Sequence, residues 1–186
     1  MRRNITHQPT EKPEFQERVL EINRVARVVK GGKRVRFRAL VVLGNEKGQV
    51  GYGVGKAADV SGGIAKAVAA AKKRINKVFI QNATIPYPVR AHYKGASVLL
   101  KPAPAGTGIV AGSSMRAVLE LAGIKDVVGK ALGSNNKLSN TVATIKALDL
   151  LIDPKELLSR RGIGQTQAHV EVPVTVPAHS HNKKAK

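Results

Sequence analysis

The chain has 186 residues and a formal charge of +20 at neutral pH, from 32 Lys and Arg against 12 Asp and Glu. Its hydrophobic fraction of 42% can fill the core of one domain or two small ones, whereas an aromatic fraction of 3% excludes base stacking as the main mode of nucleic-acid binding. The absence of cysteine excludes disulfides and thiolate zinc sites, and no apolar run approaches the roughly 20 residues that span a bilayer, so we expect a cytoplasmic protein.

The N-terminal part of the chain predicts an arm followed by a hairpin. Residues 1–17 contain two prolines and few apolar side chains, which is typical of a flexible arm. A strand is expected over residues 20–29. Gly31 and Gly32 then provide a tight turn, because glycine tolerates positive φ.

The second strand of this hairpin carries three arginines on one face. Arg34, Arg36 and Arg38 alternate with apolar residues, and side chains two apart in a strand point to the same side. The apolar run over residues 40–43 then indicates a strand that is buried on both faces.

A turn, a third strand and a helix complete the first half of the chain. We expect the turn over residues 45–48, the strand over 49–56, and a further short extended segment over 77–81. Between them, Ser61 is expected to cap a helix that runs to Asn76. The expected inner stripe of this helix consists of Ile64, Val68, Ala71 and Ile75.

Two prolines within residues 85–88 bar both helix and central strand, and so predict a domain boundary. We therefore expect domains over residues 18–82 and 83–161, with a basic tail over 162–186. The expected elements of the second domain are a hairpin over 89–101, a Gly- and Pro-rich loop over 102–112, a helix over 115–122 ended by Gly123, a strand over 127–132, a helix over 140–151 and one further turn over 155–161.

The positive charge is concentrated in the first half of the chain. Residues 1–100 carry 20 Lys and Arg against 6 Asp and Glu, while the remainder carries 12 against 6. A charge of this size calls for a polyanion, which is usually nucleic acid, with an anionic membrane surface as the alternative.

One stretch of seven cations contains no acid. It consists of Arg24, Arg27, Lys30, Lys33, Arg34, Arg36 and Arg38. A solvated strand face ordinarily mixes signs, and guanidinium groups match phosphate in a bidentate fashion. The stretch therefore predicts contact with nucleic acid.

Residues 51–56, Gly-Tyr-Gly-Val-Gly-Lys, invite a phosphate-loop interpretation that fails on inspection. A P-loop needs glycine where the chain has Val50, and Ser or Thr where it has Ala57. A dinucleotide fingerprint needs its third glycine at the position of Lys56. Nucleotide binding is not indicated here.

Cations on the first helix have two explanations. Lys72, Lys73 and Arg74 lie at its C-terminal end, where they suit the helix dipole as well as RNA. Lys66 is not explained by the dipole. The histidines show no metal-ligand spacing apart from a His-Ser-His in the tail, so we expect no metal site.

The loop over residues 102–112 supplies an enzyme hypothesis. It is rich in glycine and opens a helix, so its backbone N–H groups could face an anion, and it resembles the ATP loop of the galactokinase and homoserine kinase superfamily. Such kinases need carboxylates for magnesium. Asp149 and Asp153 lie at helical spacing beside Lys146, which is typical of a solvated face, so we expect no catalytic residues.

Three segments, in this order, closely resemble the bacterial-type family of small-subunit ribosomal proteins S-five. They are VARVVKGGKRVRF (residues 25–37), GQVGYGVGKA (residues 48–57) and GTGIVAGSSMRAVLE (residues 106–120). The resemblance covers about residues 18–160, whereas the arm and the tail do not match closely.

The resemblance implies an α+β fold. The first domain would be similar to a double-stranded-RNA-binding fold, with a three-stranded sheet and one helix. The second would be an α/β domain whose architecture is shared with those kinases, and shared architecture does not bring activity. The resemblance therefore implies a protein that is not an enzyme and needs no cofactor.

The resemblance also implies function and partners. The protein would be a structural constituent of the small ribosomal subunit in the cytoplasm, binding 16S-type rRNA, supporting assembly and contributing to decoding accuracy. Its partners would be rRNA, neighbouring proteins of the S-four and S-eight families, and mRNA near the channel by which it enters, with no membrane and no homo-oligomer. A stand-alone binder of double-stranded RNA remains the alternative and would hold generic duplexes equally well.

Particular residues acquire expected roles from this resemblance. The loop over residues 26–34 matches the family loop where changes give spectinomycin resistance, although Ala26 and Arg27 depart from some members. Gly108 and Arg116 match positions near a protein interface that affects accuracy. The expected RNA-binding residues are Arg24, Arg27, Lys30, Gly31, Gly32, Lys33, Arg34, Arg36, Arg38, Lys56 and Lys66.

Overall fold

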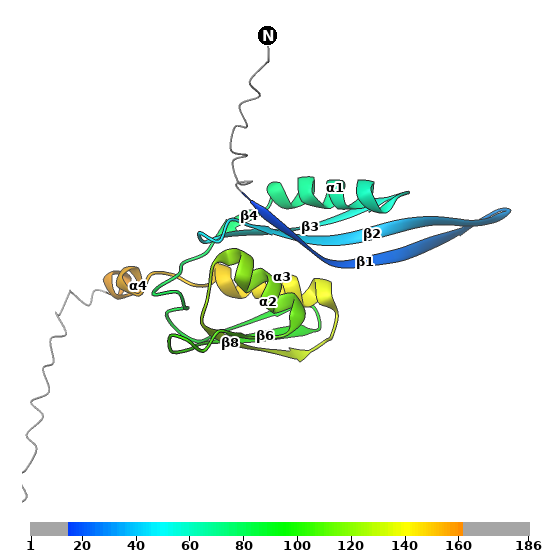
Figure 1. Ribbon diagram of the computed structural model, residues 1–186. Coiled ribbons are helices and arrows are strands. Elements are labelled where there is room, and N and C mark those ends of the chain that lie inside the picture. Colours follow the sequence, from blue (N-terminus) through cyan, green and yellow to red (C-terminus); the bar gives the residue numbers. More distant parts are fainter. Residues whose placement is uncertain (1–14, 162–186) are drawn as a thin grey trace, which may run out of the picture. The chain divides into compact units, whose positions relative to one another are not determined.

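The computed structural model describes residues 15–161, and it has the mixed α+β composition that the sequence predicts. The described residues up to Pro154 form one compact unit, and the segment that follows belongs to a second. Figure 1 shows two sheets in the first unit, with helices packed on them. The N-terminal arm and the tail over residues 162–186 lie outside the described residues, except for the last residues of the expected arm.

The first sheet is antiparallel, with the strand order β1-β2-β3-β4. Its strands are β1 (Gln16–Val29), β2 (Gly32–Gly44), β3 (Gln49–Ala57) and β4 (Ile75–Lys77). The arm expected over residues 1–17 overlaps the start of β1, because Gln16 already pairs with β2. A bulge interrupts that pairing between Val19 and Glu21. The short extended segment expected over residues 77–81 lies earlier in the chain, as β4, since Ile75 pairs with Gly51 rather than extending the helix.

Helix α1 (Val60–Lys72) packs on one face of this sheet. It ends four residues earlier than expected, and it is capped by Asp59 rather than by Ser61: the Gly62 N–H donates to the Asp59 carboxylate at 2.8 Å. The buried residues of α1 are Gly63, Ala67 and Ala71, so its inner stripe consists of smaller residues than predicted. Ile64 and Val68 are only partly buried beside this core.

The second sheet has the order β5-β6-β8-β7 and is antiparallel except for its β7–β8 pair. Its strands are β5 (Val89–Tyr93), β6 (Ala96–Pro102), β7 (Ile109–Val110) and β8 (Val127–Gly133). The helices of this half are α2 (Ser113–Ala122) and α3 (Lys137–Asp149). Gly123 ends α2 with a φ of 92°, as predicted, and α3 begins three residues early because Asn136 caps it.

The two halves of the first unit share one hydrophobic core. Helices α2 and α3 contact the face of the first sheet opposite to α1, so that layers of helix, sheet, helices and sheet follow one another (Figure 1). Val42 and Val50 from the first sheet belong to the same buried cluster as Leu121 and Val98 from the second half. The predicted boundary region is part of this core, because Ile85 is only 1% exposed.

Backbone hydrogen bonds join the β2–β3 turn to the end of α2. The Glu46 and Gly48 N–H groups donate to the carbonyl oxygens of Leu121 and Ala122, at 3.0 and 2.9 Å. A Cβ at Gly123 would lie 2.1 Å from the Glu46 carbonyl oxygen, so only glycine fits at this contact. The first sheet and α2 are therefore held together by backbone hydrogen bonds as well as by side chains.

A short helix, α4 (Pro154–Arg160), forms the described part of the second unit. Within it, Arg160 donates to Glu156 at 2.7 Å, an exposed pair at helical spacing. None of the helices found in residues 15–161 combines the length and apolar character needed to cross a membrane.

Candidate nucleic-acid interface

The register of the β1–β2 hairpin decides which of its cations share a face. Arg34 lies opposite Arg27, and Arg36 lies opposite Val25. Directly opposite residues of an antiparallel pair point to the same side. Arg38 lies on the same face of β2, two residues beyond Arg36. On the side of β2 away from β1, it lies opposite Lys56 of β3. The prediction that three arginines share a face is confirmed, and the register adds two further cations to it.

This arginine face consists of Arg27, Arg34, Arg36, Arg38 and Lys56. Four of these side chains are exposed and Arg38 is half-buried. Within the described residues, none of the five forms an ion pair with a carboxylate. Five cations without a counter-ion on one sheet surface produce a positive field that attracts a polyanion.

A shallow depression of about 190 Å³ lies in the arginine face. Its walls include Val25 and Val29 as well as Arg27, Arg34 and Lys56. The depression thus combines aliphatic side chains with cationic groups that can contact phosphates.

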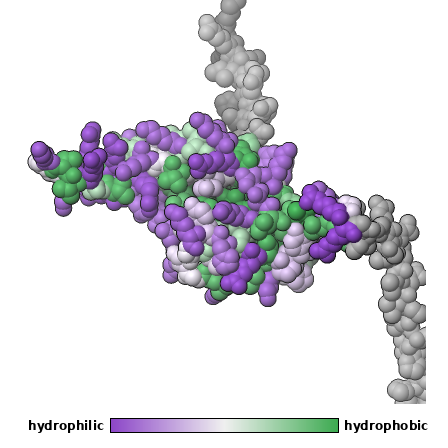
Figure 2. Space-filling model, turned by 180° about the vertical axis from the view of Figure 1, so that it is seen from behind, coloured by the Kyte–Doolittle hydropathy of each residue, from purple (hydrophilic) through white to green (hydrophobic). Residues whose placement is uncertain are grey.

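The tip of the hairpin stands clear of the rest of the protein. Gly31 has a φ of 87°, and beyond its two chain neighbours no heavy atom lies within 4 Å of the place where a Cβ would be. Beside it, Lys30 is exposed, and Val28 and Val29 are 75% and 44% exposed. Figure 2 shows hydrophilic side chains along the hairpin, with a hydrophobic patch close to its end. Such a tip can approach a partner closely with both backbone and apolar side chains.

Apart from those at the hairpin tip, three of the expected RNA-binding residues do not lie on the arginine face. Arg24 pairs with Phe37, and Lys33 pairs with Val28, so both point to the opposite side of the hairpin. Lys66 is exposed on α1, which covers that opposite side of the sheet. The sequence spacing could not separate these residues from the others, because the face of each depends on the register.

The glycine-rich segment over residues 51–56 has a structural role. Gly51, Gly53 and Gly55 lie on the face of β3 that α1 covers, and a Cβ at Gly53 would lie 2.0 Å from the carbonyl oxygen of Ala67. These glycines allow the helix to lie directly on the strand. Their backbone is buried, which agrees with the rejection of a phosphate loop.

The second candidate site is the loop that leads into α2. The Gly108 N–H donates to the buried carboxylate of Asp126 at 2.9 Å, and Gly108 has a φ of 75°. The carboxylate therefore holds the shape of the loop. Among residues 15–161, no group of three or more potential metal ligands comes together.

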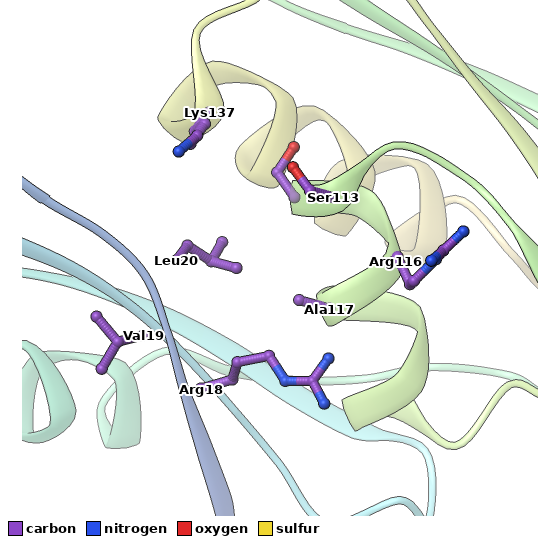
Figure 3. Close-up of a pocket in the computed structure, with 8 residues that line it drawn as sticks. Arg18, Val19, Leu20, Ser113, Arg116, Ala117 and Lys137 are labelled. Carbon is purple, nitrogen blue, oxygen red and sulfur yellow. The ribbon is translucent and has the colours of Figure 1, made fainter.

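Arg116 lies beside a pocket that the sequence did not reveal. This pocket, of about 310 Å³, is also lined by Arg18 from β1 and by Lys137 from the start of α3 (Figure 3). Arg18 forms an ion pair with Glu120 of α2, and so joins the first strand to the second half of the chain. No sequence signal pointed to Arg18 or Lys137, because their proximity arises from the packing of α2 against both β1 and α3.

Comparison with known proteins decides the family. Residues 15–79 match the pattern described as Ribosomal protein S5, N-terminal domain, and residues 91–161 match Ribosomal protein S5, C-terminal domain. The chain belongs to the ribosomal protein S5 family. The resemblance drawn from the three sequence segments is thus confirmed, and the S5 family is a structural, non-enzymatic one.

Individual members of the S5 family are similar over most of their length. A protein of Trichormus variabilis named small ribosomal subunit protein uS5 is 46% identical over 170 residues, which cover 91% of this chain and 98% of the relative. Proteins of the same name from Nostoc punctiforme and Synechococcus sp. are 50% and 52% identical, over 82% and 84% of this chain and 88% and 73% of theirs.

Proposed function

We propose that this S5-family chain is a constituent of the small ribosomal subunit in the cytoplasm and binds 16S-type rRNA through its arginine face. The observation that carries the proposal is the row of five cations on β1, β2 and β3, none of which forms an ion pair with a carboxylate of the described residues. Its relatives carry the name of a small-subunit protein, which supports the same assignment. Phosphate contacts of Arg and Lys would supply affinity, and the hairpin would fix the register of the RNA.

The hairpin tip and the second half of the chain would have different partners, namely RNA and a neighbouring protein. Lys30, Gly31 and Gly32 would reach into RNA as a narrow, exposed turn. Gly108 and Arg116 would contribute to decoding accuracy by contact with a neighbouring protein, of the S-four or S-eight family. In the subunit, the chain would lie near the path of mRNA and would be present as a single copy. Its two domains would extend over residues 18–82 and 83–161.

The decisive experiment reverses charge on the two sides of the same hairpin. The double variant Arg34→Glu with Arg36→Glu changes the arginine face, and we expect it to lose rRNA binding while thermal unfolding shows an intact fold. Each lost phosphate contact lowers the dependence of log K on log salt by roughly 0.7–0.9, so the slope should fall by about 1.5 or more. The measurement is affinity for small-subunit rRNA across a salt series.

The matched control is Arg24→Glu with Lys33→Glu, which makes the same charge change on the opposite face of the same two strands. We expect the control to weaken binding less than the first variant, through the general field alone. Equal losses from both variants would contradict a role specific to the arginine face. Unchanged affinity in a folded Arg34→Glu/Arg36→Glu protein would remove the proposal altogether.

A further inference from the structure

The pocket of about 310 Å³ beside α2 lies between three elements of the fold. Ser113 and Ser114 begin α2, Leu20 belongs to β1, and α3 begins with Lys137. Figure 3 shows the Leu20 side chain pointing toward the start of α2, with Lys137 near one end of the pocket and Arg18 near the other. Its volume is at the lower end of the range for pockets that bind small molecules.

The backbone at the start of α2 has N–H groups without an internal partner. The cap residue, Gly112, has no side chain that could accept from them. Within residues 15–161, no group accepts a hydrogen bond from the N–H of Ser113, Ser114 or Met115, and the helical bonds begin with Arg116 N–H to Gly112 O at 2.8 Å. Such N–H groups, at the positive end of the helix dipole, favour an anion.

A buried hydroxyl is a second and independent sign of a ligand at this place. Ser114 is only 7% exposed, and it lines the pocket. In the described part of the chain, its hydroxyl has no hydrogen-bond partner. Buried hydroxyls are ordinarily paired, because an unpaired one has given up its hydrogen bonds to water. An oxyanion in the pocket would accept a hydrogen bond from this hydroxyl.

Two cations from other elements border the pocket. Lys137 is exposed and forms no ion pair with a carboxylate of the described residues. Arg18 donates to Glu120 through Nη1, which holds the side chain in place, while its Nε and Nη2 donate to no described group. Arg116 extends away from Leu20 (Figure 3), so its guanidinium is not counted among the donors.

We propose that this pocket binds a terminal phosphate, either free phosphate or the phosphate group of a phosphorylated small molecule. A terminal phosphate carries a charge of about −1.5 to −2 at neutral pH and has three acceptor oxygens. The donors come from three directions, namely the start of α2, Arg18 on β1 and Lys137 on α3. They therefore suit three oxygens on one centre. A backbone phosphate of RNA carries one charge and has two free oxygens, so it matches the pocket less well.

The inference goes beyond the proposed function, because the pocket shares no residue with the arginine face. It names a second ligand of a different class, a small anion, at a separate place on the chain. Failure of either assignment leaves the other intact.

The test titrates the full-length, ¹⁵N-labelled chain with inorganic phosphate at constant ionic strength and follows its amide resonances. We expect saturable shifts that are largest at Ser113, Ser114 and Met115. Dimethyl phosphate, a singly charged diester, should bind at least tenfold more weakly. Shifts spread over exposed Lys and Arg, with none at the start of α2, would overturn the site. Equal affinity for both probes would overturn the assignment to a terminal phosphate and favour an RNA backbone.

Phenyl phosphate distinguishes the two sources of a terminal phosphate. Tighter binding than that of inorganic phosphate would support a phosphorylated small molecule whose apolar part lies against Leu20. Equal or weaker binding, with the same amide shifts, would support free phosphate.

Variants then test the donors. We expect Ser114→Ala to lower the affinity for inorganic phosphate roughly tenfold, because it removes a hydrogen bond to a charged group, and Lys137→Gln to lower it as well. The matched controls are Ser97→Ala on β6, where the serine is also 7% exposed, and Lys125→Gln, which changes an exposed lysine outside the pocket. Both controls should keep the wild-type affinity. Wild-type affinity in a folded Ser114→Ala protein would overturn the inference.

Discussion

At the scale of single residues, the glycines of β3 show how a sequence pattern can resemble one function and serve another. Gly53 lies where α1 crosses the strand, and the nearest atoms to an added Cβ belong to helix backbone, at 2.0 Å from Ala67 O and 2.6 Å from Ala71 N. Backbone cannot move aside as a flexible side chain can. The Gly-Tyr-Gly-Val-Gly-Lys segment is thus a helix-packing surface.

We expect Gly53→Ala to lower the free energy of unfolding by about 1–3 kcal/mol, the usual cost of overpacking a core. Urea unfolding followed by circular dichroism measures this. Gly95→Ala is the control, because its added Cβ would meet its nearest neighbour, Ser134 Cβ, at 3.7 Å, an ordinary contact. That control should change stability by less than about 0.5 kcal/mol. Equal stability of the two variants would show that α1 shifts freely on the sheet.

Residue patterns could predict part of the arginine face but not all of it. Alternation alone placed Arg34, Arg36 and Arg38 on one side. Whether Arg27 or Arg24 joins them depends on the pairing of β1 with β2, which a single strand does not encode. Arg18 and Lys137 could not be predicted at all, because they meet across two elements.

At the scale of elements, the start of α1 shows why helix boundaries were the least accurate predictions. Both Asp59 and Ser61 are residue types that cap helices. In the structure, Asp59 accepts hydrogen bonds from the Gly62 N–H and from the Ser61 hydroxyl, so Ser61 supports the cap instead of forming it. The existence and order of most elements, by contrast, followed from periodicity and turn residues, although β7 lies within the expected loop over residues 102–112.

The cap predicts a pH dependence for α1. The Gly62 N–H, followed by the Ser61 hydroxyl, lowers the pKa of Asp59 from its ordinary value of 3.8, because both donate to the charged carboxylate. This stabilisation is complete above the pKa of the unfolded chain and is lost as the pH falls through the lower pKa of the folded protein. We expect Asp59→Asn to unfold at a lower temperature than the wild type at neutral pH.

The difference between Asp59→Asn and the wild type should narrow as the solution is acidified below pH 3.8, because the wild-type carboxylate then becomes neutral too. Thermal melts in a pH series measure this convergence. A gap that stays constant from neutral to acid pH would show that the charge of Asp59 does not contribute. Asn can still accept the hydrogen bonds, so the comparison isolates the charge.

At the scale of the whole molecule, the two family domains are separate segments of the sequence but share one hydrophobic core in the structure. The S5 N-terminal and C-terminal patterns end at residue 79 and begin at residue 91, close to the boundary predicted at the prolines. The core, however, continues from one to the other, and the Arg18–Glu120 ion pair and the bond from Glu46 N–H to Leu121 cross between them. Because the core is continuous, we expect the two domains to unfold together in a single cooperative transition.

This continuity predicts that the first domain is unstable alone. A fragment over residues 15–82 would lose α2 and α3 and so uncover Val42 and Val50, each 0% exposed in the full chain, together with the partly buried Leu20. Each large side chain that becomes exposed costs roughly 1.5–3 kcal/mol, and a total stability of about 5–15 kcal/mol does not absorb several such losses. We expect the fragment to bind a hydrophobic dye and to melt without a cooperative transition, whereas the chain over residues 15–161 melts in one step. A fragment that unfolds cooperatively would establish that the arginine face is carried by an autonomous domain and that the shared core is a contact between two finished folds.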